Sequence, residues 1–232
     1  MNKVGDAKFW ADVEALKSEK SGNTPKIDLK EVKAEAKEDG SVAIYIDDAI
    51  NGFYGIDAST VVKAIHDSKG KAITMYVNSP GGSVFDGLSI YNAMQDHEGD
   101  IKVKVTGIAA SIASIIALGG KEKPEMSTGT RFMIHNASVF AGGDHRALRV
   151  TADLVESITG DLVKIYENIT GMDAQSLTDY MDNETFFSAE DAVSNGFATM
   201  AVKVEPQNTD TTDSVRAEVL RNLTNCQLQA IK

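Results

Sequence analysis

Apolar and polar positions along the middle of the chain follow two periods, and these periods predict the secondary structure. One period is the alternation of a strand, as at Val42, Ile44 and Ile46. The other is helical spacing, at which apolar residues recur between the strands. The predicted strands are residues 42–46, 72–77, 101–106 and 131–135. The predicted helices cover residues 57–70, a segment around 88–94, and residues 110–118. Strand, turn and helix thus repeat three times, which predicts an α/β fold with a mostly parallel sheet.

A longer apolar stripe follows Gly142 and Gly143. Its residues are spaced by 7, 3, 4, 3 and 4 positions, and Gly171 ends it. This heptad-like spacing predicts one helix of about six turns. The helix could project and join copies of the chain, or it could pack along its own domain. The stripe consists of Leu148, Val155, Ile158, Leu162, Ile165 and Ile169.

The two ends of the chain differ in composition from its middle. Residues 1–40 are rich in charge and include Phe9, Trp10, Val13 and Leu16 at helical spacing, so we interpret them as an appendage with a short amphipathic helix. Residues 41–204 form the predicted domain, which ends with a short helix at 188–194 and a strand at 198–204. Residues 205–232 are predicted to be a polar linker and a tail helix.

Composition narrows the class of protein. The chain has 232 residues and a formal charge of -11, which argues against nucleic acid as its main partner. Its one cysteine, Cys226, excludes an internal disulfide framework and any zinc site built from several cysteines. No apolar run reaches the roughly 18 residues of a membrane span, and the N-terminus has no apolar signal region. We therefore expect a cytoplasmic protein without a membrane partner.

Two residues at strand ends are candidates for chemistry. Reactive groups in α/β sheets lie at the carboxyl ends of strands, where His135 follows one predicted strand and Ser111 follows another after Gly107. Gly107 is predicted to end that strand. A helix that starts at Ser111 would offer free N–H groups to a developing oxyanion. On the residues alone, Ser111 could equally be a helix cap, and His135 a histidine with a structural partner. The other histidines, His66, His97 and His145, are expected to be solvated.

The turn at Gly81 and Gly82 is a second candidate. Two adjacent glycines permit a backbone that directs N–H groups into a site. The turn lacks the lysine and spacing of a phosphate-binding loop, and the chain lacks the Gly-x-Ser-x-Gly pattern of α/β-hydrolases around Ser111.

Five segments together resemble the Clp proteolytic subunit (ClpP) family in order and spacing, over residues 44–202. The N-terminal part and the segment before Ser188 look most like the ClpP-like prohead maturation proteases of tailed phages and prophages. The segments are Tyr-Val-Asn-Ser-Pro-Gly-Gly at 76–82, Gly-Leu-Ser-Ile-Tyr-Asn-Ala-Met at 87–94, Gly-Ile-Ala-Ala-Ser at 107–111, Phe-Met-Ile-His at 132–135 and Phe-Ser-Ala-Glu-Asp-Ala-Val at 187–193.

The resemblance implies a serine endopeptidase on a ClpP/crotonase-like fold with a projecting "handle" at about 137–170. It implies no metal or other cofactor. Ser111 would be the nucleophile and His135 the general base. The family's aspartate falls on Glu184, with Asp182 as the alternative and Asp179 on the same segment. The backbone N–H groups of Gly82 and Ile112 would form the oxyanion hole, and Gly81, Gly142 and Gly143 would contact substrate.

The resemblance also implies partners. The family forms rings, so we expect a ring-forming homo-oligomer that cleaves proteins or peptides, with capsid or scaffold precursors as the substrates and the host cytoplasm as the location if a phage encodes it. The N-terminal part does not resemble the family's axial gating loops, which argues against an ATPase partner. The alternatives are an ATPase-dependent housekeeping Clp subunit, a crotonase-type acyl-CoA enzyme with a carboxylate base, and a shell or scaffold protein without enzymatic activity.

Overall fold

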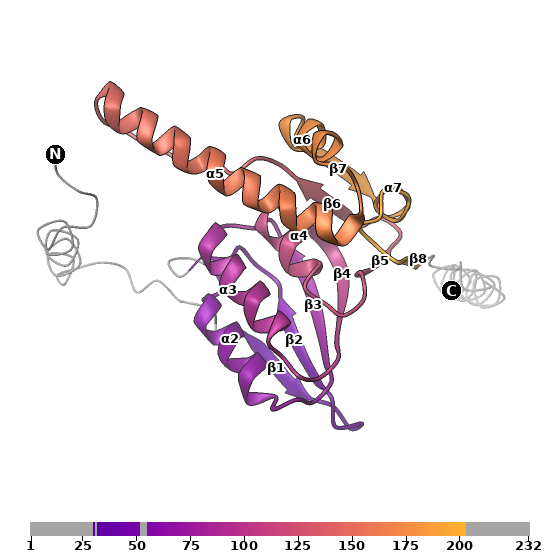
Figure 1. The fold of residues 1–232 in the computed structure, drawn as a ribbon. Coiled ribbons are helices and arrows are strands. Elements are labelled where there is room, and N and C mark those ends of the chain that lie inside the picture. Colours follow the sequence, from indigo (N-terminus) through magenta and orange to yellow (C-terminus); the bar gives the residue numbers. More distant parts are fainter. Residues whose placement is uncertain (1–29, 31, 52–54, 203–232) are drawn as a thin grey trace, which may run out of the picture. The chain divides into compact units, whose positions relative to one another are not determined.

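The computed structural model describes the chain at residue 30 and over residues 32–51 and 55–202 (Figure 1). Within this part, eight strands form one sheet in the order β1-β2-β3-β4-β5-β8, and β6 pairs with both β4 and β7. The strands are β1 (Lys33–Ala36), β2 (Val42–Ile46), β3 (Ile73–Ser79), β4 (Ile101–Ala110), β5 (Glu125–Ser127), β6 (Arg131–Ile134), β7 (Thr185–Ser188) and β8 (Met200–Val202).

The centre of the sheet is parallel, as predicted. β2, β3 and β4 run in the same direction, and β4 continues parallel to both β5 and β6. Antiparallel pairing occurs at β1 with β2 and at β7 with β6. The carboxyl ends of β4 and β6 therefore lie together, which positions the residues that follow them.

Helices pack against the sheet and bury its apolar side chains. α2 contacts α3, α3 contacts α4, and α4 contacts α5 (Figure 1). Ile44, Met75, Val103 and Ile115 are among the fully or almost fully buried residues of this core, and each such side chain stabilises the fold by about 1.5–3 kcal/mol. The helices are α2 (Ala58–Asp67), α3 (Val84–Gln95), α4 (Ile112–Ala117), α5 (His145–Thr170), α6 (Ala174–Asp182) and α7 (Ala189–Ser194).

Short polar side chains begin most of these helices. Asp57, Ser83, Asp144 and Asp173 each accept a backbone N–H of the first turn, and Ser188 forms a capping box with Asp191 at α7. These caps satisfy N–H groups that have no acceptor inside the helix, so helix starts are specified locally.

The prediction that Gly107 ends the third strand is wrong, because β4 continues to Ala110. The pairing of β3 with β4 is irregular here, and Asn78 Oδ1 accepts a hydrogen bond from the Ile108 N–H at 3.3 Å. A Cβ atom at position 107 would lie 2.2 Å from that oxygen. Gly107 therefore makes room for the Asn78 side chain and does not break the strand.

Three strands, β1, β5 and β7, were not predicted. β1 lies in the segment interpreted as an appendage, and its Lys-Ala-Glu-Ala sequence alternates only alanine with charged residues, which are types that strands disfavour. All four residues are exposed, yet the strand pairs with β2. The sheet therefore begins at Lys33, before position 41. The predicted helices around Phe9 and in the tail lie outside the described residues. Among the helices that the structure describes, none is long and apolar enough to cross a membrane.

The long predicted helix is confirmed as α5, and its two halves have different surroundings. Toward its C-terminus, Leu162 and Tyr166 are buried and Ile165 packs against the core. Toward its N-terminus, Leu148 and Leu154 are 44% and 56% exposed, and this half extends away from the sheet (Figure 1). The second half of the helix thus packs along its own domain, and the first half leaves apolar side chains uncovered.

Candidate active site

Ser111 lies at the junction of β4 and α4 in a backbone conformation that few residues adopt. Its φ and ψ are 55° and -131°, and a non-glycine residue in such a region costs about 1–3 kcal/mol. The Ser111 N–H donates to the Met133 carbonyl of β6 at 3.0 Å. Its hydroxyl caps no backbone group of α4 and is therefore available to a side chain.

His135 is the side chain that the Ser111 hydroxyl contacts. Ala110 pairs with Met133 across β4 and β6, so the residues that follow these strands emerge at the same edge of the sheet. His135 Nε2 lies 2.8 Å from Ser111 Oγ. If the neutral imidazole carries its proton on Nδ1, Nε2 accepts the hydroxyl proton. The predicted proximity of these two residues is present in the structure.

Glu184 faces the other nitrogen of the imidazole. Its Oε1 lies 3.7 Å from His135 Nδ1, which is within ion-pair range and longer than a hydrogen bond. Thr185 pairs with Ile134 in the antiparallel β6–β7 ladder. Glu184 precedes Thr185 and His135 follows Ile134, so this register sets the two side chains opposite each other. Glu184 has a φ of 44° and its side chain is 71% exposed.

The two aspartates proposed as alternatives have other partners. Asp182 Oδ1 accepts a hydrogen bond from Asn136 Nδ2 at 2.7 Å. Asp179 Oδ1 accepts one from Gln175 Nε2 at 2.8 Å. Of the three acidic candidates, Glu184 is the one that the structure places against His135.

The turn of Gly81 and Gly82 packs directly against Ser111. The φ angles of these glycines are 94° and 149°. A Cβ atom on Gly81 would lie 2.6 Å from Ser111 Cβ, and one on Gly82 would lie 2.2 Å from the Ile50 carbonyl oxygen. Ile50 holds the turn from both sides, because it donates to the Gly81 carbonyl and accepts from the Ser83 N–H, each at 2.8 Å. Only glycine fits both positions.

A cavity of about 230 Å³ joins these groups. Ile112 is the first residue of α4, and such N–H groups have no acceptor within their helix. Gly81, Gly142 and Gly143, the residues predicted to contact substrate, do not line this cavity. Gly142 and Gly143 lie in an exposed segment before α5. Residues around the cavity include Gly82, Ser111, Ile112, His135, Leu162 and Tyr166.

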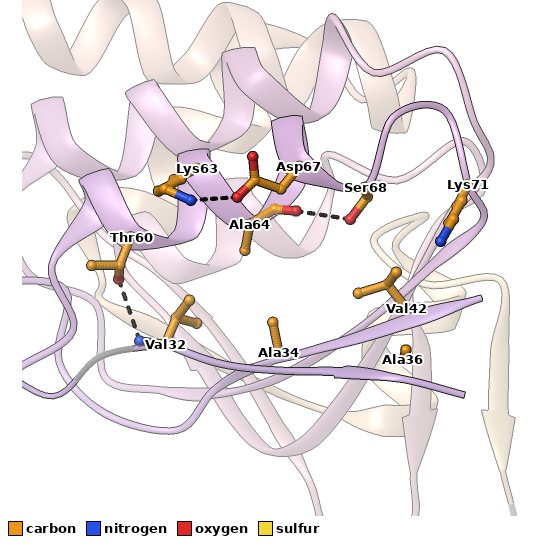
Figure 2. Close-up of a pocket in the computed structure, with 10 residues that line it drawn as sticks. All are labelled: Val32, Ala34, Ala36, Val42, Thr60, Lys63, Ala64, Asp67, Ser68 and Lys71. Atoms are coloured by element: carbon orange, nitrogen blue, oxygen red, sulfur yellow. Dashed lines mark hydrogen bonds and ion pairs between the residues drawn. The ribbon is translucent and has the colours of Figure 1, made fainter. Parts of the chain in front are cut away.

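A second cavity, of about 450 Å³, lies between β1, β2 and α2 (Figure 2). Its wall carries the Lys63–Asp67 ion pair, and the Ser68 hydroxyl there donates to the Ala64 carbonyl. The Thr60 hydroxyl donates to the Asp57 carbonyl. No histidine lines it, so it does not combine a nucleophile with a base as the first cavity does.

The remaining histidines lie away from this site. His66 and His145 are exposed, as predicted, and His97 is half-buried with its Nε2 at 2.9 Å from the Lys71 carbonyl oxygen. Over the described residues, no three histidine, cysteine, aspartate or glutamate side chains form a group that could hold a metal ion.

Sequence reasoning missed Tyr166 at this site. Its hydroxyl lies 2.7 Å from the hydroxyl of Ser114, and both side chains are buried behind Ser111. A signal was present, because Tyr166 follows Leu162 by one turn inside the apolar stripe, where a buried phenol needs a polar partner. The identity of that partner depends on how α5 packs on α4.

A serine in contact with a histidine whose far side faces a carboxylate, at the strand ends of an α/β sheet, is the arrangement of a serine hydrolase. Comparison with known families identifies the family of serine hydrolases to which the chain belongs. The family model described as Clp protease matches residues 56–205. The chain therefore belongs to the Clp protease family, which confirms the predicted fold, and it is a serine peptidase.

Curated relatives agree with this assignment. The chain is 34% identical over 137 residues to the ATP-dependent Clp protease proteolytic subunit 1 of Prochlorococcus marinus strain MIT 9312, which covers 59% of this chain and 70% of the relative. It is 33% identical over 143 residues to the protein of the same name from strain NATL2A, covering 61% and 73%. The predicted similarity to phage prohead proteases is not tested by these relatives and stays a prediction.

Proposed function

We propose that Ser111, His135 and Glu184 form the catalytic triad of this peptidase. The observation that carries the proposal is the 2.8 Å contact between His135 Nε2 and Ser111 Oγ. His135 takes the hydroxyl proton as Ser111 Oγ attacks the peptide carbonyl, and then gives that proton to the leaving amine. Water, activated by the same imidazole, hydrolyses the acyl-enzyme.

The oxyanion of the tetrahedral intermediate is bound by the backbone N–H groups of Gly82 and Ile112. Both residues line the cavity beside Ser111. N–H groups that are fixed before the reaction stabilise developing charge without reorganisation. Gly81 supports this role, because the turn approaches Ser111 too closely for any side chain at that position.

Glu184 orients His135 and stabilises the imidazolium. The 3.7 Å separation in the free protein shortens to a hydrogen bond when positive charge develops on the ring. The exposed Glu184 side chain can make this movement without disturbing the core. A crotonase-type mechanism is disfavoured, because it would need a carboxylate base at the reacting centre, where the structure has the Ser111–His135 pair.

We further propose that the chain acts without an ATPase, in the cytoplasm, as a maturation protease for capsid or scaffold precursors. Its motifs and its divergent N-terminal part resemble the phage-encoded members of the family. The alternative is an ATPase-dependent housekeeping subunit, which the names of the two curated relatives favour. Members of the family form rings. The exposed apolar side chains of α5, Leu148 and Leu154, are the surface that we expect to join copies of this chain.

A serine-reactive fluorophosphonate probe tests the triad. Wild-type protein should hydrolyse a peptide substrate and should be labelled on Ser111. Ser111→Ala and His135→Ala should each abolish hydrolysis and labelling, and the double variant should be no worse than either single one, because triad members act as a unit.

Ser138→Ala is the matched control, since this serine lines the same cavity and is exposed. It should keep activity and labelling. Activity that survives in Ser111→Ala, with the label moved to another serine, would contradict the assignment. A wild-type protein that hydrolyses no peptide and takes no label would favour the non-hydrolytic alternatives.

A further inference from the structure

Behind Ser111, two buried hydroxyl groups connect the nucleophile segment to the long helix α5. The Ser114 hydroxyl donates to the Ser111 carbonyl, and it lies 2.7 Å from the Tyr166 hydroxyl. Ser114 is 0% and Tyr166 1% exposed. Ser114 lies on α4 and Tyr166 on α5, two helices that pack together (Figure 1).

The direction of each hydrogen bond follows from counting protons. A serine hydroxyl has one proton, and that of Ser114 is directed to the Ser111 carbonyl. Tyr166 must therefore donate to Ser114. Burial raises the pKa of Tyr166 well above its ordinary value, so the phenol keeps the proton that it donates.

This relay ends on the peptide group that presents the proposed oxyanion donor. The Ser111 carbonyl accepts the Ser114 hydroxyl and also the Ser114 N–H at 3.0 Å. The same planar peptide unit carries the Ile112 N–H, which points opposite to the carbonyl. Holding the carbonyl therefore sets the direction of the Ile112 N–H. The ψ angle of Ser111 that places this peptide belongs to the strained conformation described above.

We propose that Ser114 and Tyr166 are positioning residues, which hold the Ser111–Ile112 peptide so that the Ile112 N–H points into the oxyanion hole. This inference rests on the proposed function of Ser111 and Ile112. The buried half of α5, which carries Tyr166, would then help to position the active site, in addition to any contact that the exposed half makes.

Three variants separate positioning from stability. Ser114→Ala removes both hydrogen bonds and leaves the Tyr166 phenol buried without a partner, so it should lower both the melting temperature and kcat. Tyr166→Phe should lower kcat less, because Ser114 can still reach the carbonyl. The double variant Ser114→Ala/Tyr166→Phe leaves neither hydroxyl unpaired and should recover much of the melting temperature.

A positioning role and a merely structural role predict opposite results for kcat in the double variant. Removing an oxyanion donor outright costs about 100- to 1,000-fold, so a misdirected donor should cost about 10- to 100-fold. Positioning therefore predicts a kcat as low as that of Ser114→Ala, with KM within about twofold of wild type. A kcat that recovers together with the melting temperature would overturn the proposal. Ile65→Val, a core change in α2, should lower the melting temperature and leave kcat unchanged.

Hydrogen exchange gives a readout that does not depend on turnover. The amides at the start of α4 should exchange faster in Ser114→Ala and in the double variant than in wild type or Ile65→Val. Unchanged exchange in both Ser114 variants would also overturn the proposal. If the proposed function itself is wrong, the Ser111→Ala variant will still hydrolyse the peptide at the wild-type rate. That result is distinct from the outcomes that overturn the positioning role.

Discussion

Ser111 and Glu184 are both held in backbone conformations that side chains rarely adopt, with φ angles of 55° and 44°. Such strain persists only where neighbouring groups determine the geometry more strongly than the residue itself does. At Ser111 the hydrogen bonds of its N–H and its carbonyl provide this restraint. At Glu184 the N–H donates to the Met181 carbonyl at 3.1 Å. Of the described non-glycine residues with positive φ, these two face His135, and the third, Lys69, lies in the turn after α2.

At the residue scale, Glu184→Gln tests the acid of the proposed triad. A neutral amide can stabilise the wrong imidazole tautomer, an effect worth about 10,000-fold in a buried triad. The Glu184 side chain is 71% exposed, and its Oε1 lies 3.7 Å from His135 Nδ1. We therefore expect kcat to fall by less than in a buried triad, but by at least about 100-fold. Steady-state peptide hydrolysis measures it, and circular dichroism checks that the fold is kept.

Asp182→Asn is the matched control. Its carboxylate accepts only the Asn136 amide among the contacts that the structure describes for it, so activity should stay near that of wild type. The reverse outcome, a collapse with Asp182→Asn and little change with Glu184→Gln, would show that Asp182 moves onto His135 during turnover.

At the scale of elements, α5 combines two functions along one apolar stripe. Its buried half contributes Leu162 and Tyr166 to the core and to the wall of the active-site cavity. Its other half exposes Leu148, Val150 and Leu154. A charge at Leu162 would therefore disrupt the fold, so a test of assembly belongs at the exposed end of the helix.

Leu148→Glu/Leu154→Glu should lower the assembly state without unfolding the chain. Each leucine that becomes buried on association contributes up to about 1.5–3 kcal/mol, and a charge there opposes burial. Light scattering and native mass spectrometry measure the assembly. Ser157→Glu, which adds a charge to an exposed polar position of α5, should leave it unchanged. A wild-type chain that is monomeric at micromolar concentration would contradict this expectation.

At the scale of the whole molecule, the fold and the family define a peptidase, and the two candidate functions differ in how protein substrates reach its site. For an ATPase-dependent subunit we expect the cleavage of proteins to need the ATPase partner. The maturation protease that we propose cleaves proteins without that help.

The purified chain should therefore cleave a reduced and alkylated protein in the absence of ATP and of any other subunit. Gel electrophoresis with mass spectrometry of the fragments follows the reaction. Ser111→Ala should show no cleavage, which excludes a contaminating protease. Cleavage of short peptides combined with an intact protein substrate would favour the housekeeping alternative.

The amino-acid sequence by itself determined the central strands and helices, because the spacing of apolar residues along the sequence reflects which side chains are buried. It also indicated Ser111 and His135, since residues after parallel strands share one edge of a sheet. It could not indicate β1, because the Lys-Ala-Glu-Ala segment is exposed and consists of residue types that are depleted in strands.

Tertiary structure decided what depends on pairing between distant segments. The β6–β7 register placed Glu184 and not Asp182 against His135. The packing of α5 on α4 joined Tyr166 to Ser114, 52 positions apart in the chain. The irregular pairing of β3 with β4 at Asn78 gave Gly107 a role inside β4. Local patterns specify burial and helix caps, whereas the partner of a given side chain is set by contacts that form only when the whole domain has folded.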